Sequence, residues 1–277
     1  MTVIARRFWP TMGTVASLML ADTADIDEAA RIASDVLGAL DGRFSSYRDD
    51  SEVSRFDAGE LPELSRDLRH ILAACDWLAD ESDGVFSMHP HGSDGPVDVA
   101  GYVKGWAVDR AADGLLAAGI RDFCLGVGGD WRTHGGPADG RPWTIGVLDP
   151  LDTSRPRALV SLRDLAIATS GRYERGDHLH LPPAHGGTGD RTTASFTVVG
   201  PRLAWADAFA TTAFLKGDAG LAWVAQFAGY AGALVRSDGS MVADADFPLT
   251  AAPPAARLAR LRAPYPADPA ALPSALC

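Results

Sequence analysis

The chain has fewer positive than negative side chains and no long apolar run, and each of these features excludes a class of function. Its 277 residues include 25 Lys and Arg against 36 Asp and Glu, which gives a formal net charge of −11. Such an acidic balance disfavours nucleic acid or an anionic membrane as the main partner. No stretch of 18 apolar residues occurs, so direct insertion into a membrane is not expected.

Cysteine is also scarce. Cys75, Cys124 and Cys277 have neither paired nor CxxC spacing, so they predict no disulfide framework. Cys75 falls at an apolar helical position and Cys124 beside a strand, which favours core packing for both. The first residues contain no unbroken apolar segment of the kind found in a signal peptide, and we therefore expect a cytoplasmic, reducing location.

Several catalytic motifs are missing. The sequence contains no HExxH, no GxSxG, no P-loop and no GxGxxG. His178, His180 and His185 share one segment, with His89 and His91 elsewhere, but none forms a helical pair and no thiolates accompany them. Zinc is therefore not expected. A phosphate ligand on so acidic a protein would call for a divalent cation to offset the field.

The order of elements predicts an α+β fold. Helices are expected at 25–40, 65–82, 105–119, 203–216 and 219–229, and strands at 3–9, 14–20, 123–127, 143–148, 158–162, 165–169, 194–200 and 232–236. Residues 48–59 read as a polar loop and 177–193 as irregular chain. Helices and strands come in mixed order rather than in strict βαβ alternation. We expect one compact body over residues 1–250 and an Ala/Pro-rich tail over 251–277.

One stretch, Val97 to Asp109, is the first candidate for a ligand-binding site. It is interpreted as the end of a strand that passes through a tight glycine loop into a helix. Asp98, the Gly101 backbone and Lys104 then come together within seven residues. Bare backbone lets a charged ligand approach and lysine supplies a point charge, which is typical of loops that meet phosphates or metals. The alternative is that Lys104 is a solvated surface residue.

A second candidate site lies on the expected helix 203–216. Asp207 and Thr211 are four residues apart, which places both oxygens on one helix face. A carboxylate, a hydroxyl and backbone carbonyls suit Mg²⁺. The alternative is that Asp207 caps or solvates the helix and Thr211 packs. Gly128-Gly129-Asp130 and Thr169-Ser170-Gly171 follow or end strands, where they either form turns or line a polar cleft.

Taken in order, these motifs resemble one family, the bacterial FAD:protein FMN transferases of the ApbE type. The resemblance extends from about residue 8 to about residue 240 and is most specific in VKGWAVD at 103–109 and ATSGRYERG at 168–176. The other matching pieces are Met12–Thr14, Phe44–Tyr47, Ser51–Asp57, Gly84–Phe86, Val127–Asp130, Ser195–Pro201 and Ala206–Gly217.

The resemblance implies a T-fold-like α+β architecture of mixed or antiparallel sheets packed with helices, with FAD in an elongated cleft. It implies a Mg²⁺-dependent enzyme that cleaves the FAD pyrophosphate and releases AMP. The FMN becomes attached through a phosphoester to a Thr or Ser hydroxyl of a target flavoprotein. The implied partners are FAD and an acceptor flavoprotein with an FMN-binding domain.

The resemblance also implies roles for individual residues. Asp207 and Thr211 would bind the metal through their side chains and Gly101 through its carbonyl. His178, Lys104 and Asp207 would be catalytic. The residues expected to contact the flavin nucleotide are Met12, Tyr47, Phe86, Ser87, Met88, Asp98, Lys104, Gly128, Gly129, Asp130, Thr169, Ser170, Gly171, Leu179 and His180.

Two features depart from the family pattern and keep other functions open. The family's DPxTG motif is replaced by a segment beginning His178-Leu179-His180-Leu181, so either histidine fits the functional position. The family's Phe-Asp pair reads Phe86-Ser87 here. One alternative is therefore a non-catalytic FAD-binding carrier or sensor. Another is a Mg²⁺-dependent FAD pyrophosphatase that gives FMN and AMP, with the same metal site but no acceptor groove.

Overall fold

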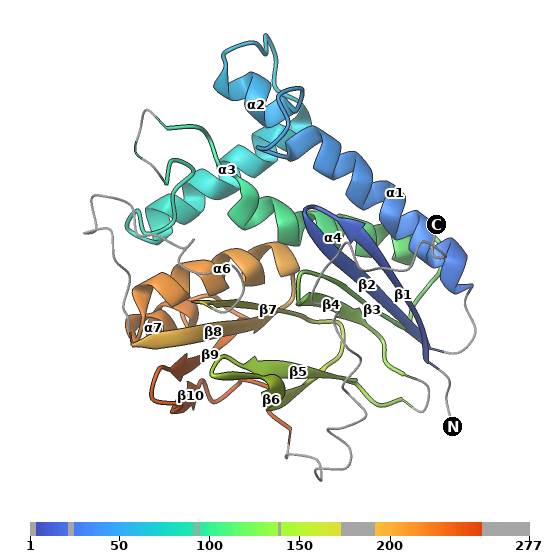
Figure 1. The fold of residues 1–277 in the computed structure, drawn as a ribbon, viewed down its shortest axis with the longest axis vertical. Coiled ribbons are helices and arrows are strands. Elements are labelled where there is room, and N and C mark those ends of the chain that lie inside the picture. The colour runs from blue at the N-terminus through green and yellow to red at the C-terminus, as the bar shows by residue number, and fades with distance from the viewer. Residues whose placement is uncertain are drawn as a thin grey trace.

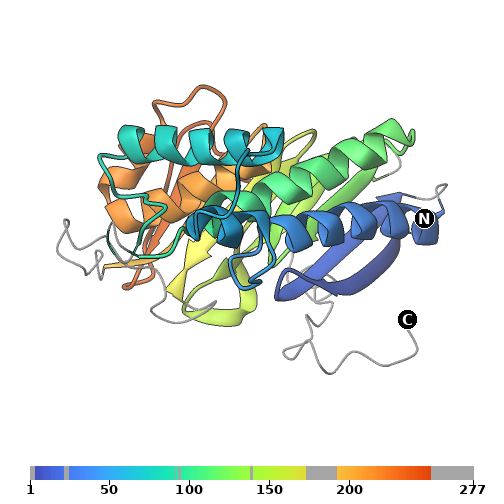
Figure 2. The same cartoon turned by 90° about the horizontal axis from the view of Figure 1, so that it is seen from above.

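The structure, a computed structural model, describes residues 4–21, 25–90, 92, 95–137, 140–172 and 192–250, and these form three layers (Figures 1 and 2). A large sheet lies between a layer of helices and a two-stranded ribbon. Every strand pair in both sheets is antiparallel. The predicted α+β class with antiparallel sheets is confirmed.

The large sheet has eight strands in the order β1-β2-β3-β4-β7-β8-β9-β10. Their bounds are Ile4–Thr11, Thr14–Ala21, Phe123–Val127, Asp130–His134, Ala166–Gly171, Thr193–Gly200, Ala231–Arg236 and Met241–Ala243. The ribbon consists of β5 (Trp143–Asp149) and β6 (Asp152–Leu162). Along β5, buried and exposed residues alternate strictly, as expected for a strand with one covered face.

The helical layer contains α1 (Ile26–Phe44), α2 (Glu52–Asp57), α3 (Arg66–Glu81), α4 (Ala100–Ala117), α6 (Leu203–Lys216) and α7 (Ala219–Val224). Asp25, Ser51 and Ser65 cap the first three, because each side chain accepts a hydrogen bond from a backbone N–H of the first turn. Viewed from above, α1, α3, α4 and α6 lie across the sheet (Figure 2).

Two apolar clusters hold the layers together. The larger cluster joins the helices to the sheet, and the smaller one joins the sheet to the ribbon. Strand β8 contributes to both, because Phe196 and Val198 point to the helices while Val199 points to the ribbon. All eight residues of β8 are therefore buried. The central strands are rigidly held on both faces, which makes their ends a firm base for a site.

Most predicted elements are confirmed, and the differences have local causes. Helix α2 falls within the predicted polar loop 48–59; its six residues are too few to show a helical period. Helix α7 ends at Val224 rather than at 229, because the chain continues in tight turns through Phe227 and Tyr230. Strand β4 begins directly at Asp130, so the glycines before it form a hairpin turn that the sequence reading did not extend into a strand.

The stretch before α4 is also different from the prediction. Residues 95–99, directly before the helix, form no strand; instead the Asp98 N–H donates to the Met88 carbonyl at 2.8 Å. The helix begins at Ala100, whose N–H donates to the Asp98 carboxylate at 2.8 Å. Gly101 therefore lies in the first turn of α4 rather than in a loop. The interpretation of a strand followed by a glycine loop was wrong.

Two predictions fall outside the described residues. The tail 251–277 and most of the segment 177–193 lie there, so the division into a body and a tail stays a prediction. Within the described residues, no helix has both the length and the apolar composition needed to cross a membrane.

Candidate functional site

Two hairpin turns meet at one end of the large sheet. Met12–Gly13 joins β1 to β2 with φ of +48° and +69°, and Gly128–Gly129 joins β3 to β4 with φ of +63° and +94°. Positive φ at both central residues defines the hairpin turn that matches the twist of the strands. The Gly128 N–H donates to the Val15 carbonyl at 3.2 Å, so the turns lie side by side. This arrangement sets Asp130 at the start of β4.

The end of β7 reaches the same place. Strand β4 pairs antiparallel with β7, and the Thr169 N–H donates to the Asp130 carboxylate at 2.9 Å. The Thr169 and Thr197 hydroxyl groups are hydrogen-bonded at 2.9 Å across β7 and β8. The hydroxyl-rich strand end therefore lines a polar site rather than an outer edge of the sheet.

Helices α4 and α6 cross above these strand ends. A Cβ on Gly105 would lie 2.5 Å from the Leu203 carbonyl oxygen, so only glycine allows this approach. Four residues later, the buried Asp109 accepts the Ala204 N–H at 3.0 Å and so stabilises the start of α6. Sequence reasoning missed both roles. The Gly-x-x-x-Asp spacing inside VKGWAVD was the available signal, since it places both residues on one helix face.

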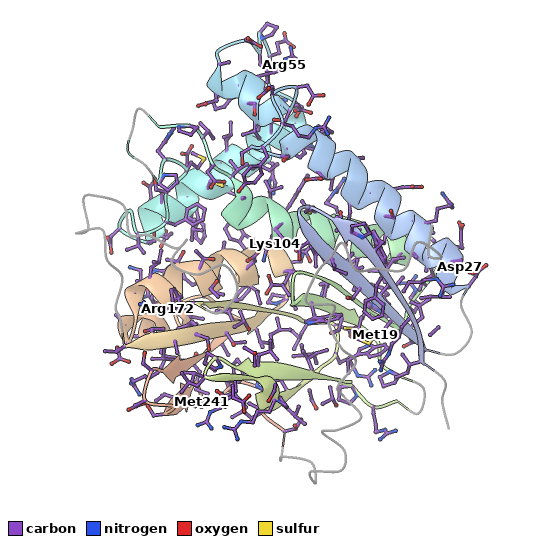
Figure 3. All side chains as sticks on the ribbon, viewed as in Figure 1. Met19, Asp27, Arg55, Lys104, Arg172 and Met241 are labelled. Carbon is purple, nitrogen blue, oxygen red and sulfur yellow. The ribbon has the colours of Figure 1, made fainter. Side chains whose placement is uncertain are left out.

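Three charged residues from three elements converge below this crossing. The Lys104 ammonium hydrogen-bonds the Asp130 carboxylate and lies 3.3 Å from Asp207 Oδ1. The side chains of Asp130 and Asp207 are only 3% and 6% exposed, and that of Lys104 is 27% exposed. Figure 3 labels Lys104 between α4 and α6. The alternative of a solvated surface lysine is therefore wrong, and two carboxylates face one ammonium group.

Asp207 is the most perturbed member of this cluster. Burial raises the pKa of its carboxyl to about 7; the Lys104 ammonium opposes the increase and the Asp130 carboxylate adds to it. Its second oxygen, Oδ2, is buried and has no hydrogen-bond partner in the described part of the chain. A buried carboxylate oxygen without a partner is costly, so it indicates a ligand that supplies one.

Thr211 lies one turn after Asp207 on α6. Its hydroxyl is hydrogen-bonded to the Ser170 hydroxyl at 3.0 Å. The described residues contain no group of three His, Cys, Asp or Glu side chains that would hold a metal. A metal here would instead bind one carboxylate, one hydroxyl and backbone or substrate oxygens. That donor set suits Mg²⁺, which keeps waters and substrate oxygens among its ligands, and the unpartnered Oδ2 fits it.

The Phe86 segment lies against the start of α4. Phe86 is buried, and a Cβ on Gly101 would lie 3.0 Å from its ring, so Gly101 allows the ring to approach. The Ser87 hydroxyl accepts the His89 N–H at 3.0 Å, and the Met88 carbonyl accepts the Asp98 N–H. These residues thus adjoin the first turn of α4, and their contact with a nucleotide stays a prediction.

The structure connects the remaining predicted site residues less directly with the Lys104 cluster. Tyr47 is 89% exposed in the turn after α1. Gly171 ends β7 opposite Ser195. His178, Leu179 and His180 lie outside the described residues, so the choice between the two histidines stays open.

The fold is shared with solved structures. The structure is similar to the flavin transferase ApbE from Vibrio cholerae, with a TM-score of 0.78 and 23% identity over 89% of this chain and 99% of that chain. It is also similar to the flavinyl transferase ApbE of Pseudomonas stutzeri in its apo form, with a TM-score of 0.74 and 23% identity over 88% of this chain and 96% of that chain. At these identities the likeness shows the fold.

The sequence identifies the family. The model of the ApbE family matches residues 12–91 and 89–234, and the chain therefore belongs to the ApbE family. The FAD:protein FMN transferase of Vibrio cholerae is 33% identical over 131 residues, which cover 44% of this chain and 39% of that relative. The enzyme of the same name from Rhodobacter capsulatus is 44% identical over 80 residues, which cover 28% of this chain and 15% of the relative. These alignments thus span two fifths or less of the curated relatives.

Proposed function

We propose that this protein is a Mg²⁺-dependent FAD:protein FMN transferase. Its family membership and the activity for which its curated relatives are named support the assignment. The single observation that carries it is the buried Lys104–Asp130–Asp207 cluster with an unpartnered Asp207 oxygen. Two carboxylates against one ammonium leave an excess negative charge, which favours a divalent cation.

The proposed metal ligands are the Asp207 carboxylate, the Thr211 hydroxyl and the Gly101 carbonyl. When bound, Mg²⁺ would neutralise charge on the pyrophosphate oxygens. Asp130 holds the Lys104 ammonium in place beside Asp207, where it adds a second positive charge for the phosphates. This combination resolves the difficulty of binding a polyphosphate in an acidic protein.

The proposed reaction transfers FMN to an acceptor protein. The hydroxyl oxygen of an acceptor Thr or Ser attacks the phosphorus on the FMN side of the pyrophosphate, and a new P–O bond forms. The P–O bond to the AMP phosphate breaks, and AMP leaves with the bonding electrons. A base takes the hydroxyl proton, and His178 or His180 is the proposed base. Such a transfer depends mainly on positioning and on charge neutralisation.

The strand ends and turns around the cluster are proposed to line the nucleotide. Met12, the Gly128–Gly129 turn and Thr169 lie around Asp130 at one end of the sheet. Phe86 and Asp98 adjoin the start of α4. The first group surrounds Asp130, the partner of Lys104, and the second adjoins the start of the helix that carries Lys104, which supports an extended nucleotide that passes the lysine.

The decisive experiment uses the full chain, FAD, Mg²⁺ and the FMN-binding domain of a candidate acceptor flavoprotein. The intact mass of the acceptor is measured, and AMP is quantified in parallel. An acceptor that gains the mass of one phosphoester-linked FMN, with one AMP released, is the expected result. AMP without acceptor modification would instead identify a pyrophosphatase, and intact bound FAD would identify a carrier; either outcome overturns the transferase.

Asp207→Ala tests the metal assignment. We expect Mg²⁺-dependent transfer to fall by more than about 100-fold, because loss of residues that merely orient metal ligands already costs about 10–100-fold. The fold should persist, since the change removes a buried carboxylate that lacks one partner. Mg²⁺ binding by calorimetry and thermal unfolding are measured together.

Asp35→Ala is the matched control, because it removes an exposed carboxylate from α1. It should leave both Mg²⁺ binding and transfer unchanged. A folded Asp207→Ala protein that binds Mg²⁺ and transfers FMN normally would remove Asp207 from the metal site.

A further inference from the structure

A large cavity lies on the other face of α6. Its volume is about 570 Å³ and its aromatic lining comes from Trp77, Trp205, Phe209, Phe227 and Tyr230, which we call the aromatic groove. Trp205 and Phe209 are one turn apart, and about half a turn separates them from Asp207 and Thr211. The aromatic groove is therefore distinct from the Lys104 cluster, although one helix contributes to both.

The rings of the groove are mutually packed. The centroids of Trp77 and Trp205 are 5.0 Å apart and those of Phe209 and Phe227 are 4.4 Å apart. Tyr230 is fixed as well, because a Cβ on Gly200 would lie 2.0 Å from its ring. Trp77 at the rim is nevertheless 39% exposed. A preformed aromatic surface that exposes a tryptophan is typical of a docking site.

The length of chain that follows the last described residue indicates which segment covers the aromatic groove. The described chain ends where the Thr250 N–H donates to the Leu159 carbonyl at 2.8 Å. Two residues earlier, Pro248 lines a smaller cavity of about 270 Å³ together with Gly229 and Tyr230. The last described residues pair with β6 on the ribbon side of the sheet, and Tyr230 borders both this smaller cavity and the aromatic groove. The 27 residues that follow can extend about 3.1 Å each when rich in proline, which is ample reach.

The composition of the tail 251–277 matches the groove. It contains six prolines, and Tyr265 stands between Pro264 and Pro266. Proline-rich segments bind aromatic-lined grooves, because their extended conformation is already ordered before binding. The tail also carries three arginines and a single acid, Asp268. Exposed Asp76 and Asp80 flank Trp77 on α3 and supply the complementary charge.

We propose that the tail 251–277 docks in the aromatic groove of its own chain. The features of the tail that match the groove are the run Pro264-Tyr265-Pro266 and the three arginines. This interaction goes beyond the transferase function and needs neither FAD nor metal.

Trypsin tests the proposal, because Arg257, Arg260 and Arg262 are cleavage sites inside the tail. The rate of cleavage at these three arginines is followed by mass spectrometry on the full chain, beside a free peptide of residues 251–277. Cleavage of a docked segment follows the fraction that is transiently released. We expect the full chain to be cleaved at least about fivefold more slowly than the peptide, a difference that a docked fraction above four fifths produces.

Two variants should abolish the protection. Trp77→Ala removes a wall of the groove, and Tyr265→Ser changes only the tail and cannot unfold the body. Val242→Ala is the matched control, since Val242 is 41% exposed on β10 outside the groove. The control should be cleaved like the unmodified chain, with thermal unfolding checked for all three.

Three outcomes would overturn the proposal. A tail cleaved as fast as the free peptide is not docked. Protection that survives both Trp77→Ala and Tyr265→Ser does not come from the groove. Protection that disappears on dilution comes from a second copy of the chain rather than from the same molecule.

Discussion

The two faces of α6 are held in place by different kinds of interaction. Toward the strand ends, Asp207 and Thr211 face a few polar partners at defined distances, and one oxygen lacks a partner. Toward α3, Trp205 and Phe209 pack among other rings with no hydrogen bond between them. Ring packing tolerates small shifts, whereas a charged cluster loses its function when one partner moves.

This difference separates the residues of α6 that serve ligand binding from those that stabilise the fold. Burying charge disfavours folding unless partners compensate, so the polar face is maintained for chemistry. Burying aromatic surface stabilises the fold directly. Substitutions on the polar face should therefore change ligand binding more than stability, and those on the aromatic face the reverse.

The largest loss of stability should come from Gly105→Ala, because this change displaces α6 and so disturbs both of its faces. A Cβ there would lie 2.5 Å from the Leu203 carbonyl oxygen and 2.9 Å from the Ala204 Cα, and both are backbone atoms. Helix α6 would have to move away from α4. We expect the free energy of unfolding to fall by about 3 kcal/mol, at the upper end of the usual cost of overpacking. Urea denaturation measures it.

Gly114→Ala is the control on the same helix. A Cβ at Gly114 would meet only Ile32 and Val36 methyl groups, at 3.5 and 3.7 Å, which is ordinary contact. Since alanine is the better helix former, stability should be unchanged or rise by up to about 1 kcal/mol. Equal losses for the two variants would show that the crossing is not the critical contact.

The sequence predicts eight of the ten described strands, the long helices and the identity of the cluster residues, because each depends on local periodicity or on a short motif. It does not predict the crossing at Gly105 or the Asp109 bond to α6, because those contacts join residues about one hundred positions apart. The helix start at Ala100 was missed for a local reason. A glycine three residues before a lysine, as Gly101 is before Lys104, occurs both in loops and in the first turn of a helix.

The aromatic face of α6 also depends on contacts that the sequence does not predict. Trp205 and Phe209 carry a helical period that predicts core, which is what Phe209 is. The exposure of Trp77 depends on how α3 lies over α6, and no local pattern records that packing. Likewise, the predicted site residues could be named from the resemblance, but the Asp130–Lys104 pair appears only once β4 and α4 are folded together.

Asp130→Asn should have an intermediate effect that is confined to the polar face. The change removes one of two carboxylates, and Lys104 then pairs with Asp207 alone. Both consequences weaken attraction for a cation, so we expect Mg²⁺ affinity to fall by about tenfold, equivalent to about 1.4 kcal/mol. Calorimetry measures the affinity. The asparagine oxygen can still accept the Thr169 N–H, which keeps the strand end in place.

The tail provides the internal check for this variant. Trypsin cleavage at Arg257, Arg260 and Arg262 should be unchanged, because the aromatic groove is on the other face of α6. A change in tail cleavage with no change in Mg²⁺ affinity would reverse the assignment of the two faces.

The smallest effect should come from Ser170→Ala. The Ser170 hydroxyl holds the Thr211 hydroxyl at 3.0 Å, so its loss frees the Thr211 side chain to rotate away from Asp207. A single hydrogen bond contributes about 1 kcal/mol, so Mg²⁺ affinity should fall by about fivefold while thermal unfolding barely changes. Ser195→Ala is a close control, because Ser195 faces Gly171 on the next strand and its buried hydroxyl has no hydrogen-bond partner among the described residues. If both variants weaken Mg²⁺ equally, the Ser170 hydroxyl does not position Thr211.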